Sequence, residues 1–535
     1  MSDSPLAAPR DHAGVLAAMT RTRPLTLDRP QPAAAALMVI ALFVILRLIA
    51  AHFIGLGVDE SYSVAVARDL HLSYFDHPPL HYWIAHAVEP LVGVGRGSRI
   101  PFIALFAGSC WLMFILTRRL FGDQAAFWAV LGLNLSGFFT VAAGSWVLPD
   151  GPLIFGLLAA ATILAESWFG GRDTASLSPA HPLLTWSVAG VCIGLAGLSK
   201  YQAALFCVGL GLFLISTPRG RRQLLGPGPY LAAILAVAVL SPVLAWNAQH
   251  HWASFAFQAG RGAPGRLHPW GPLEALGGQA ALMLPWIFAP LAGAAVFAAQ
   301  LGPKAERRWF CLMLALPPIA VFTLAPLFGP LGLPHWSMSG WLLLFPLLGD
   351  LLARSAQRRV WPRVWGVGGA VFVLAVGGLL ADDAATGWLG DHFPATFRHG
   401  DPTAESIEWT QLRPMVSHSA LLREPHAFIA ALKWNEGGKV DQAVGDLAPV
   451  AVLSDDPREF RYRHAPGGFV GGDALIIGRL ETVKARLAAL APYFKSIRLE
   501  PPVALGRDGH NEILIGVAEA RDLIQPYSKP PGGPR

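Results

Sequence analysis

Residues 34–60 read AAALMVIALFVILRLIAAHFIGLGVDE, and this stretch decides the fold class. Its almost uninterrupted apolar part has the length of roughly 20 residues that a helix needs to cross the hydrocarbon core of a bilayer. Two acids, Asp59 and Glu60, follow it directly. Comparable apolar runs recur along the chain, and they are longer than the short alternating strands of a membrane β-barrel. The pattern therefore predicts an α-helical polytopic membrane protein.

The composition of the whole chain favours the same interpretation. Hydrophobic residues fill 53% of the 535 positions and charged residues only 14%, which is more apolar than a soluble protein of this length requires. Short polar breaks separate the apolar segments. About eleven spans are expected, at residues 34–53, 99–117, 122–143, 150–168, 183–199, 201–217, 228–246, 276–300, 309–327, 336–353 and 364–381.

Basic residues in the loops set the expected orientation. If the helices alternate in direction, the arginines and lysines of four inter-helix loops lie on one side together with those of the N-terminal segment, and the positive-inside rule assigns that side to the cytoplasm. Residues 54–98, 247–275 and everything from 382 onward then face outward. The net charge of +6 reflects this topology and does not indicate a nucleic-acid partner, because the basic residues are dispersed.

Three regions are expected along the chain. Residues 1–33, rich in Ala, Pro and Arg, are predicted to form a disordered cytoplasmic tail. Residues 34–381 form the transmembrane domain. From 382 to 535 the apolar runs shorten and charges become regular, and strand-like runs such as DALIIGRL alternate with the helix-like run ETVKARLAALAPYF. This pattern predicts a small outward-facing α/β domain.

The first outward segment carries two clusters of ionisable side chains. Asp59 and Glu60 follow the first span, and Asp76, His77 and His81 lie around a double proline. Carboxylates and imidazoles grouped in this way serve as general bases or as ligands of a divalent cation. The alternative is a solvated juxtamembrane helix followed by a turn, which is the commoner use of polar residues at a membrane surface.

Later outward positions add further candidates. Asp150 begins a helix that re-enters the membrane, where an aspartate is also a good helix N-cap. Lys200 lies at the outer end of a span, where the positive-inside rule does not explain its charge, although a snorkelling lysine would give the same pattern. The remaining candidates combine aromatic, amide and guanidinium groups, which suit a sugar and a phosphate but are also typical of interfacial belts. These are Tyr201, Asn247, Arg261 and Arg266.

Other polar residues of the outer face are expected to have ordinary roles. Asp69 and His71 are interpreted as a solvated helix face, and His335 as a structural histidine. The four cysteines lie in apolar spans, where packing positions are expected in place of a disulfide framework or a metal site.

Several motifs together resemble the bacterial family 39 glycosyltransferases. They are DESYSVAVARDLHLSYFDHPPLHYW (59–83), SRIPFIALFAG (98–108), RRLFG (118–122), VLPDGPLIF (147–155), GLAGLSKYQAAL (194–205) and SPVLAWNAQHHWASFAFQ (241–258). This membrane family belongs to the GT-C class, which includes protein O-mannosyltransferases and, more distantly, lipid A aminoarabinose transferases. The resemblance covers residues 34–380, and the tail resembles the C-terminal domain of a bacterial subgroup.

The resemblance implies a GT-C fold in the bacterial inner membrane, with an outward cavity under the first loop and a sugar donor carried on polyprenyl phosphate. Asp59 matches the expected catalytic base, Glu60 its neighbour, and Asp150 a second acidic position. Asp76 and His77 align with a Glu-Lys pair of the aminoarabinose transferases. The acid of that pair helps to bind a divalent metal and the lysine contacts phosphate, so a divalent cation at Asp76 is a possible cofactor.

The resulting hypothesis is an inverting displacement at the outer face of the membrane. Asp59 would take the proton of an acceptor hydroxyl on a lipid, glycan or protein, and polyprenyl phosphate would leave, its charge stabilised by nearby cations. The sequence has no P-loop and no GxGxxG after a strand, so no nucleotide-sugar site is expected. Two alternatives are a transporter or flippase of a lipid-linked sugar, and a structural or sensory membrane protein whose outer domain binds a ligand.

Overall fold

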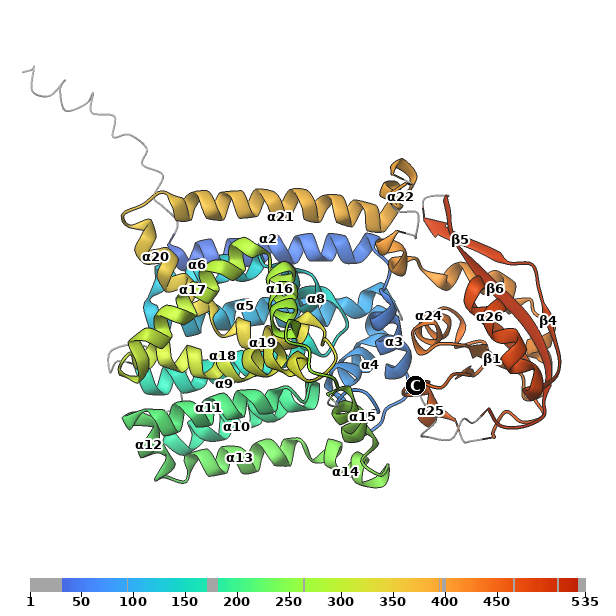
Figure 1. The fold of residues 1–535 in the computed structure, drawn as a ribbon, viewed down its shortest axis with the longest axis horizontal. Coiled ribbons are helices and arrows are strands. Elements are labelled where there is room, and N and C mark those ends of the chain that lie inside the picture. The colour runs from blue at the N-terminus through green and yellow to red at the C-terminus, as the bar shows by residue number, and fades with distance from the viewer. Residues whose placement is uncertain are drawn as a thin grey trace, which may run out of the picture.

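The computed structural model describes residues 31–93, 95–170, 181–262, 265–393, 395–396, 401–464, 467–507 and 510–527. Long helices lie side by side in one body, and a C-terminal α/β domain caps one end of that body (Figure 1). The predicted fold class is confirmed. The predicted N-terminal tail lies outside the described residues except for its last three positions.

Among the described residues, seven helical segments are long and apolar enough to cross a membrane, and four bent helix pairs bring the number of spans to as many as eleven. This agrees with the predicted number, and the chain is a multi-pass membrane protein. The seven straight segments are α2 Pro32–Phe53, Arg96–Phe121 with α5 Ile100–Phe121, α9 Asp150–Phe169, α10 Pro182–Ser199, Pro285–Lys304 with α17 Pro285–Leu301, Glu306–Leu327 with α18 Glu306–Leu324, and α21 Trp361–Thr386.

The four bent pairs explain why some predicted spans are irregular. In three of them a proline lies in the first turn of the second helix, where its missing N–H costs nothing but prevents the preceding helix from continuing. The pairs are α6 Asp123–Asn134 with Gly137–Ser145 (79°), α11 Ala203–Ser216 with α12 Pro218–Leu224 (108°), α13 Gly228–Val239 with α14 Ser241–Gln249 (49°), and Pro334–Leu342 with α20 Phe345–Ala356 (59°).

One predicted span is wrong in its bounds. Residues 276–300 are not one helix, because α16 Gly271–Met283 ends before α17 begins. Leu284 separates them with a φ of 78°. The cause is Pro285, which disfavours helical backbone in the residue before it.

The outward segments predicted as loops contain helices of their own. The first carries α3 Val58–Ala67 and α4 Leu80–Val92, and the second carries α15 Ala253–Arg261. Gly57 precedes α3, and the N–H of Gly57 donates to Glu60 Oε2 at 3.0 Å, as in a capping box. The short helices lie between the membrane body and the C-terminal domain (Figure 1).

The C-terminal domain is a mixed α/β sheet with the strand order β2-β1-β3-β6-β4, and β5 also pairs with β6. Strand β1 runs parallel to β2 and β3, whereas β6 runs antiparallel to β3, β4 and β5. The elements are β1 Phe428–Ala431, α24 Trp434–Val444, β2 Val450–Val452, β3 Ala474–Arg479, α26 Leu480–Leu490, β4 Phe494–Leu499, β5 Val503–Arg507 and β6 His510–Leu523. The strands and the helix that the sequence indicated are present.

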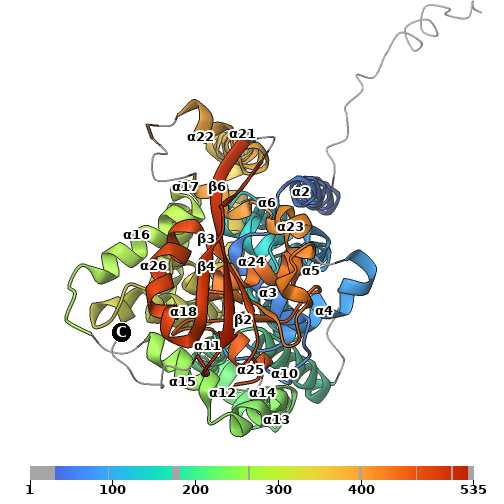
Figure 2. The same ribbon diagram turned by 90° about the vertical axis from the view of Figure 1, so that its right-hand side faces the viewer.

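The first outward segment and the C-terminal domain share one hydrophobic core. Tyr62 and Val64 of α3 pack in the same cluster as Val440 of α24 and Ile429 of β1. A side chain at Gly438 would meet the backbone of Tyr62 at 2.6 Å, so glycine lets the two helices touch. Viewed from that end of the molecule, α24 lies close to α3 (Figure 2). The two regions therefore form one structural unit above the membrane helices.

Candidate active site

A cavity of about 870 Å³ lies where the membrane body meets the C-terminal domain. Its wall combines residues from α3, the loop before α4, the start of α9, the Lys200 turn, α15 and the segment before α20. Two residues of the C-terminal domain, Trp434 and Arg458, complete the wall. Segments that are far apart in the sequence therefore meet around one space.

Asp59 lies in the first turn of α3 and its side chain opens into the cavity. Within the described parts of the chain, this carboxylate has neither a hydrogen bond nor an ion pair. Asp59 is exposed to the cavity, yet the protein packed around it desolvates the carboxylate, and this desolvation, followed by the charge of Glu405, raises the pKa of Asp59 above its ordinary 3.8. A free carboxylate with a raised pKa is suited to accepting a proton.

Glu60 points the other way, although it is the next residue in the sequence. Its carboxylate accepts two hydrogen bonds from Arg99, at 2.5 and 2.8 Å, and a third from the N–H of Val147 at 3.2 Å. Glu60 is 1% exposed and does not line the cavity. In this position Glu60 links α3 to the membrane helices. The position does not favour the predicted catalytic role.

Asp76 lines the cavity but is fully engaged by protein groups. Its Oδ1 accepts hydrogen bonds from the hydroxyls of Tyr62 (3.2 Å) and Tyr82 (3.1 Å), and Arg458 contacts its Oδ2 at 3.2 Å. Among the described residues, no group of three or more His, Cys, Asp or Glu side chains could hold a metal ion. The residues present do not fit the predicted divalent cation, since a guanidinium already neutralises Asp76.

Arg458 reaches this position from the loop after β2. Its guanidinium also pairs with Asp456 at 3.2 Å, and it lies over the rings of Trp434 (4.2 Å) and Phe257 (5.0 Å). The backbone of Arg458 is left-handed, with a φ of 52°. For a residue other than glycine such a conformation is strained, and strain of this kind is concentrated at functional sites.

Asp150 and Lys200 form a buried ion pair at the cavity wall. Lys200 Nζ donates to both carboxylate oxygens of Asp150, at 2.9 and 3.0 Å. Both oxygens of Asp150 therefore face the charge of Lys200, which makes Asp150 a poorer proton acceptor than Asp59, and the snorkelling alternative for Lys200 is wrong because its charge points into the protein. The pair joins the first turn of α9 to the end of α10 and presents one edge to the cavity.

The two histidines of the first segment differ in position. His77 lines the cavity, and burial together with the charges of Lys200 and Arg261 lowers its pKa to about 3, so its ring is neutral at physiological pH. His81 is fully buried and does not line the cavity, and its ring packs against Tyr82 at 3.7 Å. Neither histidine is a cation that could bind phosphate.

The four predicted residues of the later loops also separate into two groups. Tyr201 and Arg261 line the cavity; the Tyr201 hydroxyl shares a hydrogen bond of 2.7 Å with Ser254. Arg261 lies over the ring of Trp336 at 4.6 Å and has no carboxylate partner within the described ranges. Asn247 is buried and accepts the N–H of Phe255, and Arg266 is exposed away from the cavity.

Three residues that were expected to have no part in a site lie in surroundings that differ from the prediction. Asp69 and His71 follow the end of α3 and are not on a helix face. Asp69 pairs with Arg463 of the C-terminal domain at 2.6 Å, and the backbone carbonyl of His71 accepts a hydrogen bond from Trp83. His335 lines the cavity and lies parallel to Phe138, with ring centroids 6.2 Å apart.

The most important residues that the sequence did not single out are Trp434 and Arg458. They lie more than 350 positions after Asp59 in the chain, in a domain whose docking cannot be read from local pattern. The charged run DDPREF, which contains Arg458, was visible only as a change in composition. Gln258 belongs to the loop of aromatic and amide residues that the sequence indicated, although no site role was predicted for it, and its amide donates to the backbone carbonyl of Asp76 at 2.5 Å.

Comparisons with known proteins agree with this architecture. The family model described as dolichyl-phosphate-mannose-protein mannosyltransferase matches residues 76–246. The lipid A galacturonosyltransferase RgtD of Rhizobium johnstonii is 22% identical over 344 residues, which are 61% of this chain. The matched stretch spans 66% of that relative, just under two thirds of its length.

Two crystal structures of ArnT from Cupriavidus metallidurans share the fold. The structure bound to undecaprenyl phosphate superposes with a TM-score of 0.61 at 16% identity and covers 93% of this chain and 99% of that one. The apo structure gives 0.56 at 17% identity, with 89% and 97% covered. The predicted resemblance to the family 39 glycosyltransferases is confirmed, and the chain has the fold of these GT-C structures.

Proposed function

We propose that this protein is an inverting glycosyltransferase that moves a sugar from a polyprenyl-phosphate donor to an acceptor hydroxyl at the outer face of the bacterial inner membrane. The proposal rests on which charged side chains of the cavity wall have a partner of opposite charge and which do not. Asp59 is the one unpaired carboxylate that lines it in the described parts of the chain, and unpaired Arg261 lines the same space.

In the proposed reaction Asp59 acts as the general base. It takes the proton of the acceptor hydroxyl while the hydroxyl oxygen attacks the anomeric carbon of the donor. The new glycosidic bond forms as the bond between that carbon and the phosphate oxygen breaks, so the electron pair leaves with polyprenyl phosphate. The raised pKa of Asp59 favours the transfer of the proton.

The leaving phosphate develops charge that the cavity can stabilise. Arg261 and Arg458 both lie near the Phe257 ring, at 5.7 and 5.0 Å from its centroid, and both line the cavity. Arg458 is also paired with Asp76 and Asp456, whereas Arg261 is not paired within the described ranges. Preorganised cations in a site shielded from water are effective at stabilising developing charge. Lys200 adds a third cation, already bound to Asp150. No step requires a metal.

The donor class is supported by the relatives. One ArnT structure contains undecaprenyl phosphate, a polyprenyl phosphate, in the fold that this chain shares. RgtD is named as a transferase that acts on lipid A. Apolar side chains such as Leu205, Leu282 and Val321 line the membrane side of the cavity, where a lipid tail would enter.

The orientation is supported by the position of the basic loops. Helix α12, which carries Arg219, Arg221 and Arg222, lies at the end of the membrane body opposite the C-terminal domain (Figure 1). By the positive-inside rule that end faces the cytoplasm. The cavity and the C-terminal domain are then outside.

Purified protein incubated with sugars linked to polyprenyl phosphate tests the proposal. Wild-type protein is expected to release polyprenyl phosphate only when an acceptor with a free hydroxyl is present, and the glycosylated acceptor is expected in equal amount. Mass spectrometry of both products is the measurement. Movement of intact donor across vesicles without any release would instead favour the transporter alternative.

A further inference from the structure

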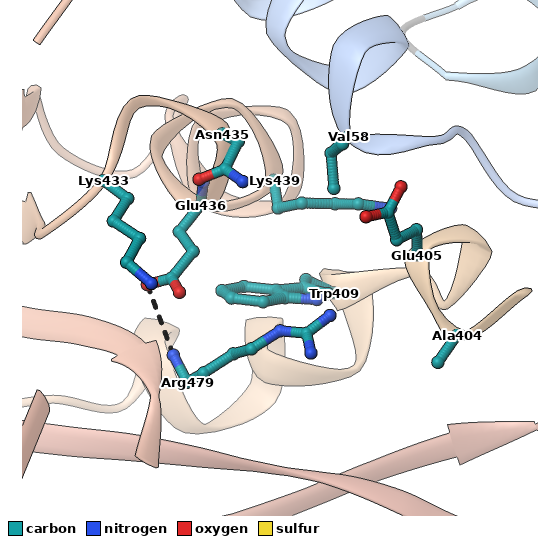
Figure 3. A pocket seen from close by; sticks show the side chains of 9 residues that line it. All are labelled: Val58, Ala404, Glu405, Trp409, Lys433, Asn435, Glu436, Lys439 and Arg479. Atoms are coloured by element: carbon teal, nitrogen blue, oxygen red, sulfur yellow. Dashed lines mark hydrogen bonds between the residues drawn. The ribbon is translucent and has the colours of Figure 1, made fainter. Parts of the chain in front are cut away.

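A second, smaller pocket of about 200 Å³ lies between the C-terminal domain and Val58 at the N-terminus of α3 (Figure 3). Liquid water takes about 30 Å³ per molecule, so this volume equals that of several water molecules. One sugar ring with a small anionic substituent fits into it. Its wall consists of Val58, Ala404, Glu405, Trp409, Lys433, Asn435, Glu436, Lys439 and Arg479.

The pocket lies at a place where α/β sheets bind ligands. Strands β1 and β3 are parallel neighbours, and their carboxyl ends lead to Lys433 and to Arg479. Helix α24 follows β1 and packs on the sheet face of Ile429 and Leu475, whereas α26 follows β3 and packs on the opposite face. Neighbouring strands whose following helices go to opposite faces leave a crevice between their carboxyl ends, and ligands bind in such crevices.

The charges of the pocket are unevenly satisfied. The buried carboxylate of Glu436 accepts the N–H of Arg479 at 3.3 Å and the hydroxyl of Thr482 at 3.2 Å. Lys439 donates to the backbone carbonyls of Leu56 and Ile407. These two groups hold the fold together and leave the mouth of the pocket to other side chains.

Lys433 and Arg479 are the cations that remain at the mouth, where the exposed acid Glu405 also lines the wall and where both cations act on the charge of Glu436. Both side chains are exposed, and neither has an ion pair among the residues that the structure describes. Trp409 and Asn435 line the same pocket, with the Trp409 ring next to Arg479 in the close view (Figure 3). Two free cations with an aromatic ring and an amide fit a saccharide that carries an anionic group.

The pocket and the large cavity are separated only by the first turns of two helices. Val58 lines the pocket and Asp59 the cavity; Lys433 lines the pocket and Trp434 the cavity. Glu405 lines the pocket and still acts on the charge of Asp59. The two spaces are therefore neighbours, with the backbone at Val58 and Asp59 and at Lys433 and Trp434 between them.

We propose that this pocket is a binding site for an anionic saccharide group of the acceptor, held by Lys433 and Arg479 while a neighbouring hydroxyl of the same molecule lies at Asp59. The identification of the ligand as the acceptor rests on the proposed function. The binding site itself does not, because its ligand class follows from the pocket. The donor phosphate has separate cations, Arg261 and Arg458, in the large cavity.

Binding can be measured without turnover. Full-length protein is titrated with glucose 1-phosphate, glucose and inorganic phosphate while undecaprenyl phosphate fills the large cavity, and saturation-transfer NMR reports the contact. The expected result is that glucose 1-phosphate binds at least tenfold more tightly than the other two. The double variant Lys433→Gln and Arg479→Gln is expected to weaken the binding of glucose 1-phosphate at least tenfold. Lys484→Gln, an exposed lysine on α26 away from the pocket, is the matched control and should change it less than twofold.

Equal binding in the double variant and the wild type would overturn the site, and equal binding of inorganic phosphate would overturn its saccharide part. In a transfer assay, the double variant is expected to raise the KM for an anionic acceptor at least tenfold and to leave kcat within twofold. If the binding result holds but no donor is turned over by the wild type, the proposed function fails while the site stands.

Discussion

Two sets of charged residues meet at α3 and differ in how they are satisfied. On the side facing the membrane helices and the C-terminal domain, each charge has a partner: Glu60 binds Arg99, and Arg463 binds both Asp69 and Asp441. On the cavity side, Asp59 and Arg261 have no partner of opposite charge within the described ranges. Two neighbouring residues, Asp59 and Glu60, therefore belong to different sets.

This difference separates stability from chemistry. A buried charge without a partner is costly, so paired charges are what a fold tolerates. A charge that remains free at a cavity contributes little to stability and is available to a substrate. Substitutions on the cavity side are thus expected to change turnover, and substitutions in the paired set to change folding.

The largest effect is expected for Asp59→Asn. This variant keeps the size of the side chain but cannot accept the acceptor proton, so kcat should fall about 10²–10⁴-fold. The melting temperature should not fall, because the carboxylate has no ion pair among the described residues and the substitution removes a desolvated charge. Release of polyprenyl phosphate is the measurement, and Glu481→Gln on the exposed surface of α26 is the control. Unchanged turnover in Asp59→Asn would refute the base assignment.

Glu60→Gln tests the paired set. The substitution leaves the guanidinium of Arg99 buried without its counter-charge, and breaking a buried pair costs about 3–5 kcal/mol. The free energy of unfolding, or the midpoint of thermal unfolding in detergent, should fall accordingly. Any protein that remains folded should still turn over donor. A folded, fully stable but inactive Glu60→Gln protein would contradict the separation.

Arg458→Gln tests whether the C-terminal domain takes part in the reaction. Loss of one preorganised donor at developing charge typically lowers kcat about 10²-fold. Arg458→Lys should recover part of this loss, because it restores the charge but not the planar geometry. Arg498→Gln, on the exposed side of β4, is the control. Equal activity of Arg458→Gln and Arg498→Gln would show that Arg458 acts only in docking.

The smallest effect is expected in the pH profile. Because the pKa of Asp59 is raised above 3.8, its carboxylate is protonated at a higher pH than an ordinary aspartate. A general base must be deprotonated, so kcat/KM should fall as the pH drops through this raised pKa. Glu405→Gln removes one neighbouring negative charge and should move the midpoint to lower pH. A midpoint that does not move would exclude electrostatic coupling between the two residues.

The membrane fold could be predicted from hydropathy because span length is a local property. The breaks at Pro218, Pro285 and Pro346 could have been anticipated, since each proline interrupts an apolar run at a position where no helix continues. The opposite directions of Asp59 and Glu60 also follow from sequence, as consecutive helical residues point about 100° apart.

The rest of the site depends on docking. Arg458 and Trp434 reach the cavity only because α24 packs on α3, and no local pattern shows that contact. The pairing of Asp150 with Lys200 could be predicted only in part. Each was predicted at the outer end of a span, yet only the packing of α9 against α10 brings them within 2.9 Å.

The configuration of the product is the most direct test of the central claim, that a single unpaired carboxylate among the described residues faces the cavity. One base, with no second free carboxylate in the described part of the cavity wall, favours a single displacement, which inverts the anomeric carbon, whereas retention needs a second carboxylate for a covalent intermediate. NMR of the glycoside formed from a donor of known configuration gives the answer. We predict inversion, and a retained configuration would contradict the account.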